Sequence, residues 1–398
     1  MAVFSRTLEQ PVERALPGRA AMVTGVFVAG FATFMNLYAT QPLLPYFRHL
    51  FGASELMVSL TVSAPVLGVA LAAPLLGLAA DSVGRKQMIV AAIACLSFAT
   101  MLAASSANLL QLIFWRFVQG LFIPGMIAVV MAYISEESAI ETVGQTMAVY
   151  VTGTVAGGFA GRLLAGVGTA RWGWRPCFAA LGIITLAGAL ATLWILPRER
   201  TFVRGKRISL SFQPLVSHLR NPQLLATCAA GFNILFCMVG VFTYVNFYLA
   251  DKPFSLGPGE LGRIFIVYLA GAAITTLVGG LMDRIGYRRA VLGAILSGAA
   301  GICLTLVHYL PVIILGLLLV AASVFISQAS AKSNVGKAAK GSRSSAAGLY
   351  VCAYYMGGFA GSIVPGIFWV EFGWPALVAV ILCAQATIAL IAYRLWEA

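Results

Sequence analysis

The chain repeats itself over half of its length. A glycine–aspartate–glycine motif that ends in basic residues occupies 77–86 and recurs at 279–289, an offset of 202 residues. A tyrosine–valine pair followed by a run of glycines occupies 150–161 and recurs at 350–361, an offset of 200. Because both copies run in the same direction, the chain is predicted to fold as two related bundles joined in tandem.

The composition indicates that lipid surrounds these bundles. Of the 398 residues, 60% are hydrophobic and 10% are charged, whereas soluble domains carry about 25% charged residues. A helix that crosses a membrane needs about 20 mostly apolar residues. The apolar runs divide into twelve such spans, six in each half: 20–45, 57–80, 87–105, 108–134, 143–169, 175–197, 223–250, 259–282, 289–309, 311–331, 344–370 and 374–395. The predicted fold class is therefore an all-α membrane protein with twelve transmembrane helices in two pseudo-symmetric six-helix bundles.

A basic stretch separates the two halves. We predict an N-terminal bundle at 1–197, a cytoplasmic linker at 198–222 and a C-terminal bundle at 223–398. No other stretch is polar enough to form a soluble enzyme domain, and the sequence has no Gly-Lys-Ser/Thr loop that would hold ATP phosphates. The seven cysteines mostly lie within spans, where they are expected to pack as small apolar residues. We therefore expect neither an enzyme nor a bound cofactor or metal.

The net charge of +13 indicates how the chain is oriented. With both termini in the cytoplasm, 19 of the 26 Lys and Arg residues fall in cytoplasmic segments and only five fall on the outer side. This distribution follows the positive-inside rule. It predicts a multi-pass membrane protein with both termini cytoplasmic, and it argues against a nucleic-acid partner.

Polar residues recur at helical spacing within several spans. Arg116 and Gln119 lie one turn apart in the fourth span, and a charge at that depth is costly and usually functional. The stripes of other spans include Asn36, Thr40, Asn233, Tyr244 and Ser327. We expect these residues to line a substrate cavity whose remaining wall is apolar and aromatic, which suits an amphipathic small molecule. Ordinary helix packing for the stripes, and snorkelling of Arg116 to the outer surface, are the alternatives.

The fifth span combines a small-residue face with a second charge. Its glycines, which let a neighbouring helix approach closely, are Gly153, Gly157, Gly158 and Gly161. Arg162 follows them at a depth similar to that of Arg116, whereas the repeat has Ser362 at this position. Two like charges repel unless acceptor groups or an anion lie between them. The partners considered for Arg162 are an anionic substrate group, backbone carbonyls near the glycines, and Glu260 of the eighth span; outward snorkelling is the alternative.

The first copy of the repeated motif has a physical basis. Gly84 permits the positive φ that a tight turn out of the second span requires. The eleventh span begins on the same side of the membrane, so Asp81 faces its positively polarised N-terminus, an arrangement that gains roughly 0.3–1 kcal/mol when exposed. We expect Asp81 to hold the two halves together on the cytoplasmic side. A solvated loop that merely follows the positive-inside rule is the alternative.

Several of these motifs resemble those of a known family. Residues 77–86 are similar to motif A of the major facilitator superfamily, 116–120 to its motif B, and the glycines of the fifth span to motif C of its twelve-helix drug/proton antiporters. The segment 38–45 resembles bacterial efflux permeases of the arabinose-efflux-like group, and this resemblance implies that the protein lies in a bacterial inner membrane. The sequence departs from motif C at Gly158, where the family has proline, and at Arg162, where it has glycine.

The resemblance implies roles for some of these residues. In the superfamily the first, fourth, seventh and tenth helices line the cavity, which agrees with the polar stripes. The resemblance also implies a gating set in the two motif A copies and the fifth span: Gly77, Asp81, Gly84, Arg85, Lys86, Asp283, Arg288, Arg289, Gly157, Gly161 and Arg162.

The expected function is secondary transport by alternating access, as proton-coupled efflux of a small organic or drug-like compound by a monomer. No acidic residue lies in the middle of a span, so the residue that carries the proton is not identified. One alternative is uptake or facilitated passage of an organic anion, which two buried arginines without buried carboxylates favour. The other is a membrane sensor that binds a substrate without transporting it.

Overall fold

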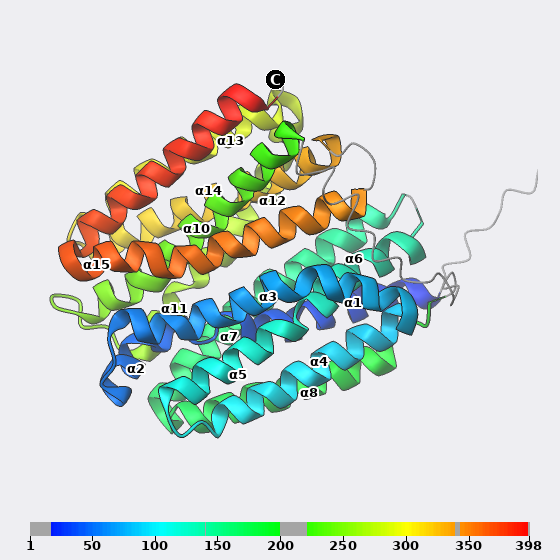
Figure 1. Cartoon of the computed structure of the whole chain (residues 1–398), viewed down its shortest axis with the longest axis horizontal. Helices are drawn as coiled ribbons and strands as arrows, with labels where there is room; N and C mark the ends of the chain where they lie inside the picture. The colour runs from blue at the N-terminus through cyan, green and yellow to red at the C-terminus, as the bar shows by residue number, and fades with distance from the viewer. Residues whose placement is uncertain (1–16, 140, 200–220, 339–342, 397–398) are drawn as a thin grey trace, which may run out of the picture.

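The computed structural model describes residues 17–139, 141–199, 221–338 and 343–396, and the regular structure of these residues is entirely helical (Figure 1). Within these ranges the side chains of 17, 74–83, 279–283, 287, 336–338 and 343–345 lie outside the description. The N-terminal half contains α1 (Pro17–Leu37), the 3-10 helix η1 (Gln41–Leu43), α2 (Leu44–Phe51), α3 (Glu55–Val83), α4 (Arg85–Ala104), α5 (Leu109–Phe122), α6 (Pro124–Glu137), α7 (Val143–Trp172) and α8 (Trp174–Ile195). The C-terminal half contains α10 (Pro222–Ala250), α11 (Pro258–Ile264), α12 (Ile266–Ile285), α13 (Tyr287–Leu304), α14 (Leu310–Ala338) and α15 (Arg343–Leu395).

The predicted number of membrane crossings is confirmed. Among the described residues, nine helical stretches are long and apolar enough to cross a membrane. The helices α7 and α13 add one crossing each. The helix α15 provides two crossings rather than one, because Gly373 breaks it with a φ of 70°. The all-α fold class with twelve spans therefore holds.

Three of the predicted spans are interrupted rather than continuous. The first span ends as a helix at Leu37 and resumes at η1, next to Pro42 and Pro45. The fourth span is divided between α5 and α6 in front of Pro124. Proline causes such breaks because it lacks an N–H group and its ring clashes with the preceding turn. The eighth span is divided between α11 and α12 at Phe265, where no proline explains the break.

The two halves reproduce the repeat in three dimensions. In the N-terminal half α7 packs against α1, and in the C-terminal half α15 packs against α10 in the same way. A Cβ atom added to Gly157 would overlap the backbone of Phe31, and a Cβ atom added to Gly357 would overlap that of Phe232. The glycines are therefore needed for close helix packing, as predicted. The motif A turns are also equivalent, since Gly84 and Gly286 have φ values of 108° and 85°.

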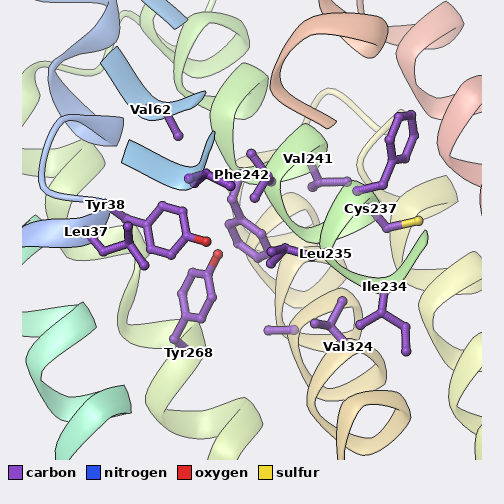
Figure 2. Close-up of a cluster of buried hydrophobic side chains, with 14 of the residues drawn as sticks. Leu37, Tyr38, Val62, Ile234, Leu235, Cys237, Val241, Phe242, Tyr268 and Val324 are labelled. Atoms are coloured by element: carbon purple, nitrogen blue, oxygen red, sulfur yellow. The ribbon is translucent and has the colours of Figure 1, made fainter. Parts of the chain in front are cut away.

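The halves meet along a shared hydrophobic core. Figure 1 shows the blue-to-green N-terminal half below the C-terminal half, with α3 and α15 running side by side between them. One buried cluster joins the halves and includes Leu37, Tyr38 and Val62 with Leu235, Phe242 and Tyr268 (Figure 2). We call the end of the molecule with α2, α11 and Gly373 the α2 end, and the end where α8 stops and α10 starts the linker end.

Candidate functional site

The interruption of the first span lies between two buried arginines. After α1 ends at Leu37, residues 38–40 form a turn, so the last carbonyl groups of α1 lack the amide partners that a continuing helix would supply. Such irregular backbone is tolerated at membrane depth only where protein surrounds it. Arg116 from α5 and Arg162 from α7 both bind this segment.

Arg116 is fully enclosed within the N-terminal half. Its side chain is 0% exposed, and its guanidinium donates to the carbonyl oxygens of Asn36 (2.8 Å), Leu37 (2.5 Å) and Thr61 (2.9 Å). The Thr61 carbonyl is available because the residue four positions later is Pro65, which has no N–H group. Arg116 therefore links α5 to α1 and α3. Outward snorkelling does not describe this residue.

A chain of hydrogen bonds extends from Arg116 through the same half. Its guanidinium also donates to the side chain of Gln119, whose amide nitrogen donates to Thr100 Oγ1 at 2.9 Å. The Thr100 hydroxyl donates to Asn36 Oδ1 at 2.9 Å, and Asn36 Nδ2 donates to Thr185 Oγ1 at 2.8 Å. The network joins α1, α4, α5 and α8. These contacts favour a structural role for Asn36, Arg116 and Gln119, and their predicted contact with substrate stays a prediction.

The other residues predicted to bind substrate have varied surroundings. Thr40 is buried and donates to the Thr61 carbonyl at 3.3 Å. Asn233 is partly buried and its amide donates to the Ala229 carbonyl of its own helix at 2.9 Å. Ser327 is buried on α14. These contacts leave the predicted binding role of the three residues as a prediction.

Tyr244 lies instead where the two halves touch at the α2 end. Its hydroxyl donates to the Ser362 carbonyl at 2.7 Å and lies 3.3 Å from Ser59 Oγ. Ser59, from α3 of the other half, contacts the same carbonyl at 3.2 Å. Beside them α7 and α11 are so close that a Cβ atom at Gly166 would overlap the Pro258 carbonyl. We call these two sets of contacts the seal.

Arg162 also lies at the α2 end of the interface between the halves. It is 3% exposed; its Nε donates to Gln41 Oε1 at 2.7 Å, and its Nη1 donates to the Gly158 carbonyl at 2.6 Å. Its guanidinium carbon is 4.8 Å from the ring centre of Tyr38, 4.8 Å from that of Phe265 and 4.7 Å from that of Tyr268. We call this set of groups the Arg162 box. The latter two rings belong to the C-terminal half.

The structure selects among the partners considered for Arg162. A carbonyl group near the glycines is one of its acceptors, as proposed from the sequence. Glu260 is not, because its carboxylate accepts a hydrogen bond of 2.7 Å from the Gly257 amide at the start of α11. Arg162 does not snorkel either, since its guanidinium is enclosed by both halves. Among the described residues no carboxylate pairs with it.

The predicted gating set is only partly described. Gly77 and Asp81 lie in α3 and Asp283 lies in α12, at positions whose burial and side-chain contacts fall outside the description. Arg85 forms a two-point ion pair with Glu136 at 2.9 and 3.1 Å, within the N-terminal half.

Two of the three other basic residues in the motif A part of the set also contact their own half. The Lys86 amide donates to Glu199 at 3.4 Å. In the second motif copy the Arg288 guanidinium lies 4.7 Å from the ring centre of Tyr393, and Arg289 is exposed.

Sequence reasoning missed most of the groups around Arg162. Tyr38 and Gln41 belong to the segment 38–45, which resembles efflux permeases, but the resemblance assigns neither residue a role. Phe265 and Tyr268 carry no signal in the sequence, because they are two aromatic residues among many in apolar spans. Ser59 carries no signal either, and the repeat identifies Ser362 only as the counterpart of Arg162. Their contact depends on two helices that are distant in the chain.

Comparisons with known proteins agree with this architecture. A family profile described as the Major Facilitator Superfamily matches residues 26–257. The Inner membrane transport protein YnfM of Escherichia coli (strain K12) is 30% identical over 98% of this chain and 94% of its own length. The crystal structure of the human organic anion transporter MFSD10 (TETRAN) has a TM-score of 0.73 at 20% identity and covers 96% of this chain and all of that one. A bacterial homologue of the human lysosomal transporter Spinster, in an inward-facing conformation, has a TM-score of 0.71 at 15% identity, covering 96% and 95%. The internal repeat, the twelve crossings and these matches show that the chain belongs to the major facilitator superfamily, a family of membrane transporters rather than enzymes.

Proposed function

We propose that the protein exports a small organic compound in exchange for protons by alternating access. The observation that carries this proposal is the seal, in which the two halves are held together by Ser59, Tyr244 and Ser362 and by the close packing of α7 against α11. The polar part of the seal consists of a few exchangeable hydrogen bonds. Two rigid halves joined in this way can separate at one end without unfolding.

The distribution of charge suggests which side is closed. If the basic segments are cytoplasmic, the α2 end faces outwards and the structure is closed to the outside. Alternating access then requires a second contact at the linker end when the seal opens. We propose that Asp81 provides it against the N-terminus of α15, while Arg85 stays bound to Glu136 within its own half.

A second candidate is passage of an organic anion without proton exchange. It is favoured by Arg162, a buried cation at the interface that has no carboxylate partner among the described residues. The two candidates differ in coupling, and one experiment separates them.

The test is uptake of a labelled solute panel into inverted membrane vesicles, with and without an imposed proton gradient. Proton-coupled export predicts accumulation that a protonophore abolishes. Flux that does not depend on the proton gradient supports passage of an organic anion. The absence of flux for every solute contradicts transport. The control is a protein with Ser59→Cys and Ser362→Cys joined by a short, reducible bifunctional thiol reagent, because the Ser59 hydroxyl contacts the Ser362 backbone carbonyl. This link keeps the seal closed, so the protein should be inactive until the link is reduced.

A further inference from the structure

Arg162 has more hydrogen-bond donors than acceptors. A guanidinium group carries five N–H donors. Gln41 accepts one of them and the Gly158 carbonyl accepts another. The remaining three, on Nη1 and Nη2, have no acceptor among the described residues. The guanidinium that carries them lies among the rings of Tyr38, Phe265 and Tyr268.

A further donor without a partner lies in the same place. The Tyr268 hydroxyl is buried and has no hydrogen-bond partner among the described groups. Figure 2 shows that the Tyr38 and Tyr268 hydroxyls point toward one another across the boundary between the halves. Buried polar groups are normally hydrogen-bonded. The buried Tyr268 hydroxyl and the three Arg162 N–H groups without an acceptor therefore indicate a place where an acceptor could bind.

The aromatic rings only partly compensate the charge. The ring faces attract the guanidinium through their quadrupoles, but each ring is neutral, so the box retains a positive charge. Buried charges in proteins are ordinarily paired with an opposite charge. The pairing group is missing from the described residues, since Glu260 is engaged at the start of α11.

The position of the box connects it to transport. Tyr38 and Gln41 come from the N-terminal half, whereas Phe265 and Tyr268 come from the C-terminal half. When the halves begin to separate at the α2 end, the Arg162 box becomes accessible from that end. An anion can then enter between the Arg162 guanidinium and the Tyr268 hydroxyl.

We propose that the Arg162 box binds the carboxylate of the transported solute, with the guanidinium fork and the Tyr268 hydroxyl as donors. A carboxylate fits because its two oxygens accept paired hydrogen bonds from a guanidinium. The surrounding rings suit a solute whose remaining part is apolar. This inference rests on the proposed transport function, but it does not depend on direction or on proton coupling.

The experiment measures binding of benzoate by the purified full-length protein through thermal unfolding, with benzamide as the neutral analogue of the same shape. A ligand at free concentration L that binds only the folded protein stabilises it by RT ln(1 + L/Kd), so the rise of the unfolding temperature with ligand concentration reports the affinity. The variants are Arg162→Gln, which keeps polar contacts without charge, and Arg162→Lys, which keeps the charge without the fork. Arg175→Gln is the matched control, because Arg175 also donates to a carbonyl (Ser106) and stacks on a ring (Trp174) but lies outside the box.

We expect benzoate to stabilise the wild type and Arg175→Gln, and benzamide to stabilise neither. Apparent benzoate affinity should fall at least tenfold in Arg162→Gln and by less in Arg162→Lys. Equal benzoate affinity in Arg162→Gln and wild type overturns the proposal, as does a wild type that benzoate does not stabilise. If Arg162→Gln does not fold, the comparison of Arg162→Lys with wild type decides, since equal affinities there would contradict recognition by the fork.

Failure of this inference is distinguishable from failure of the transport proposal. If solute flux is seen in vesicles but benzoate has no effect on unfolding, the transport proposal is supported and the carboxylate site is contradicted. If benzoate binding depends on Arg162 but no solute shows flux, the carboxylate site is supported and the transport proposal is contradicted.

Discussion

Arg116 and Arg162 are both buried arginines of the N-terminal half, and both bind the irregular segment between α1 and η1, yet their surroundings differ. Arg116 donates to three carbonyls and one amide oxygen, all from its own half. Arg162 has two acceptors and is otherwise covered by rings, two of which belong to the other half. All hydrogen-bond acceptors of Arg116 lie within one rigid bundle. Arg162 keeps all of its contacts only while the two bundles touch.

The difference shows how burial alone fails to define a role. A charge whose donors are satisfied within one rigid body holds that body together. A charge whose partners lie on two bodies responds when the bodies move, and it is available to a ligand in at least one state. We therefore assign Arg116 a structural role in the N-terminal half and propose that Arg162 binds the transported solute.

The largest expected effect is the loss of stability in Arg116→Ala. The change removes four hydrogen bonds, each of which contributes about 0.5–1.5 kcal/mol net. It leaves the Leu37 carbonyl without a donor, whereas the Asn36 and Thr61 carbonyls still accept from the Ala39 amide and the Thr40 hydroxyl. Even if water replaces part of the side chain, we expect the protein to lose about 3 kcal/mol or to fail to accumulate. Thermal unfolding of the purified protein measures this. An unfolding temperature equal to that of the parent would show that Arg116 does not stabilise the fold. Arg116 and Arg162 would then not differ in the way proposed.

Arg162→Ser should have the opposite pattern, with folding retained and transport lost. Serine fits because the repeat has Ser362 at the equivalent position of α15, against the same kind of helix pair. We expect at least a tenfold lower flux in inverted vesicles, or loss of its pH dependence, at normal expression and with an unfolding temperature close to that of the parent. Arg175→Gln serves as the control. Full transport with unchanged pH dependence in Arg162→Ser would make this arginine dispensable.

Tyr268→Phe sharpens the comparison by removing a hydroxyl while keeping the ring. One hydrogen bond contributes about 0.5–1.5 kcal/mol, so we expect benzoate affinity to fall roughly two- to tenfold. Tyr350→Phe is the matched control, because the Tyr350 hydroxyl is also buried without a partner but its ring stacks on Tyr354 instead of Arg162. Titration by thermal unfolding compares the two. Equal effects of both changes would show that the Tyr268 hydroxyl does not contact the ligand.

The smallest expected effect is that of Ser59→Ala on the seal. The Ser59 hydroxyl has one proton to share between the Leu56 carbonyl of its own helix and the Ser362 carbonyl of the other half. Its contribution should be near the low end for a hydrogen bond, about 0.5 kcal/mol. We expect roughly twofold faster labelling of a cysteine placed at Val62, which is buried between the halves in Figure 2. Unchanged labelling would locate the strength of the seal in the packing of α7 on α11.

Much of the fold could be predicted because it depends on patterns within single helices. The apolar runs define the twelve spans, and the offset repeat defines the two bundles. Gly84 and Gly286 mark turns that need a positive φ. The glycines of α7 and α15 mark faces that meet the backbone of another helix. Each of these signals is local, since length, periodicity or the absence of a Cβ atom is visible in a short stretch of sequence.

The sequence is enough to show that two charges are buried at similar depth, but the role of each charge depends on tertiary contacts. The roles depend on which carbonyls α1 leaves free where it ends at Leu37, and on Pro65 freeing one more for Arg116. They depend equally on the break at Phe265, which brings two rings of the other half over Arg162. The physical reason is that a buried charge is defined by its partners, and these partners come from helices far apart in the chain.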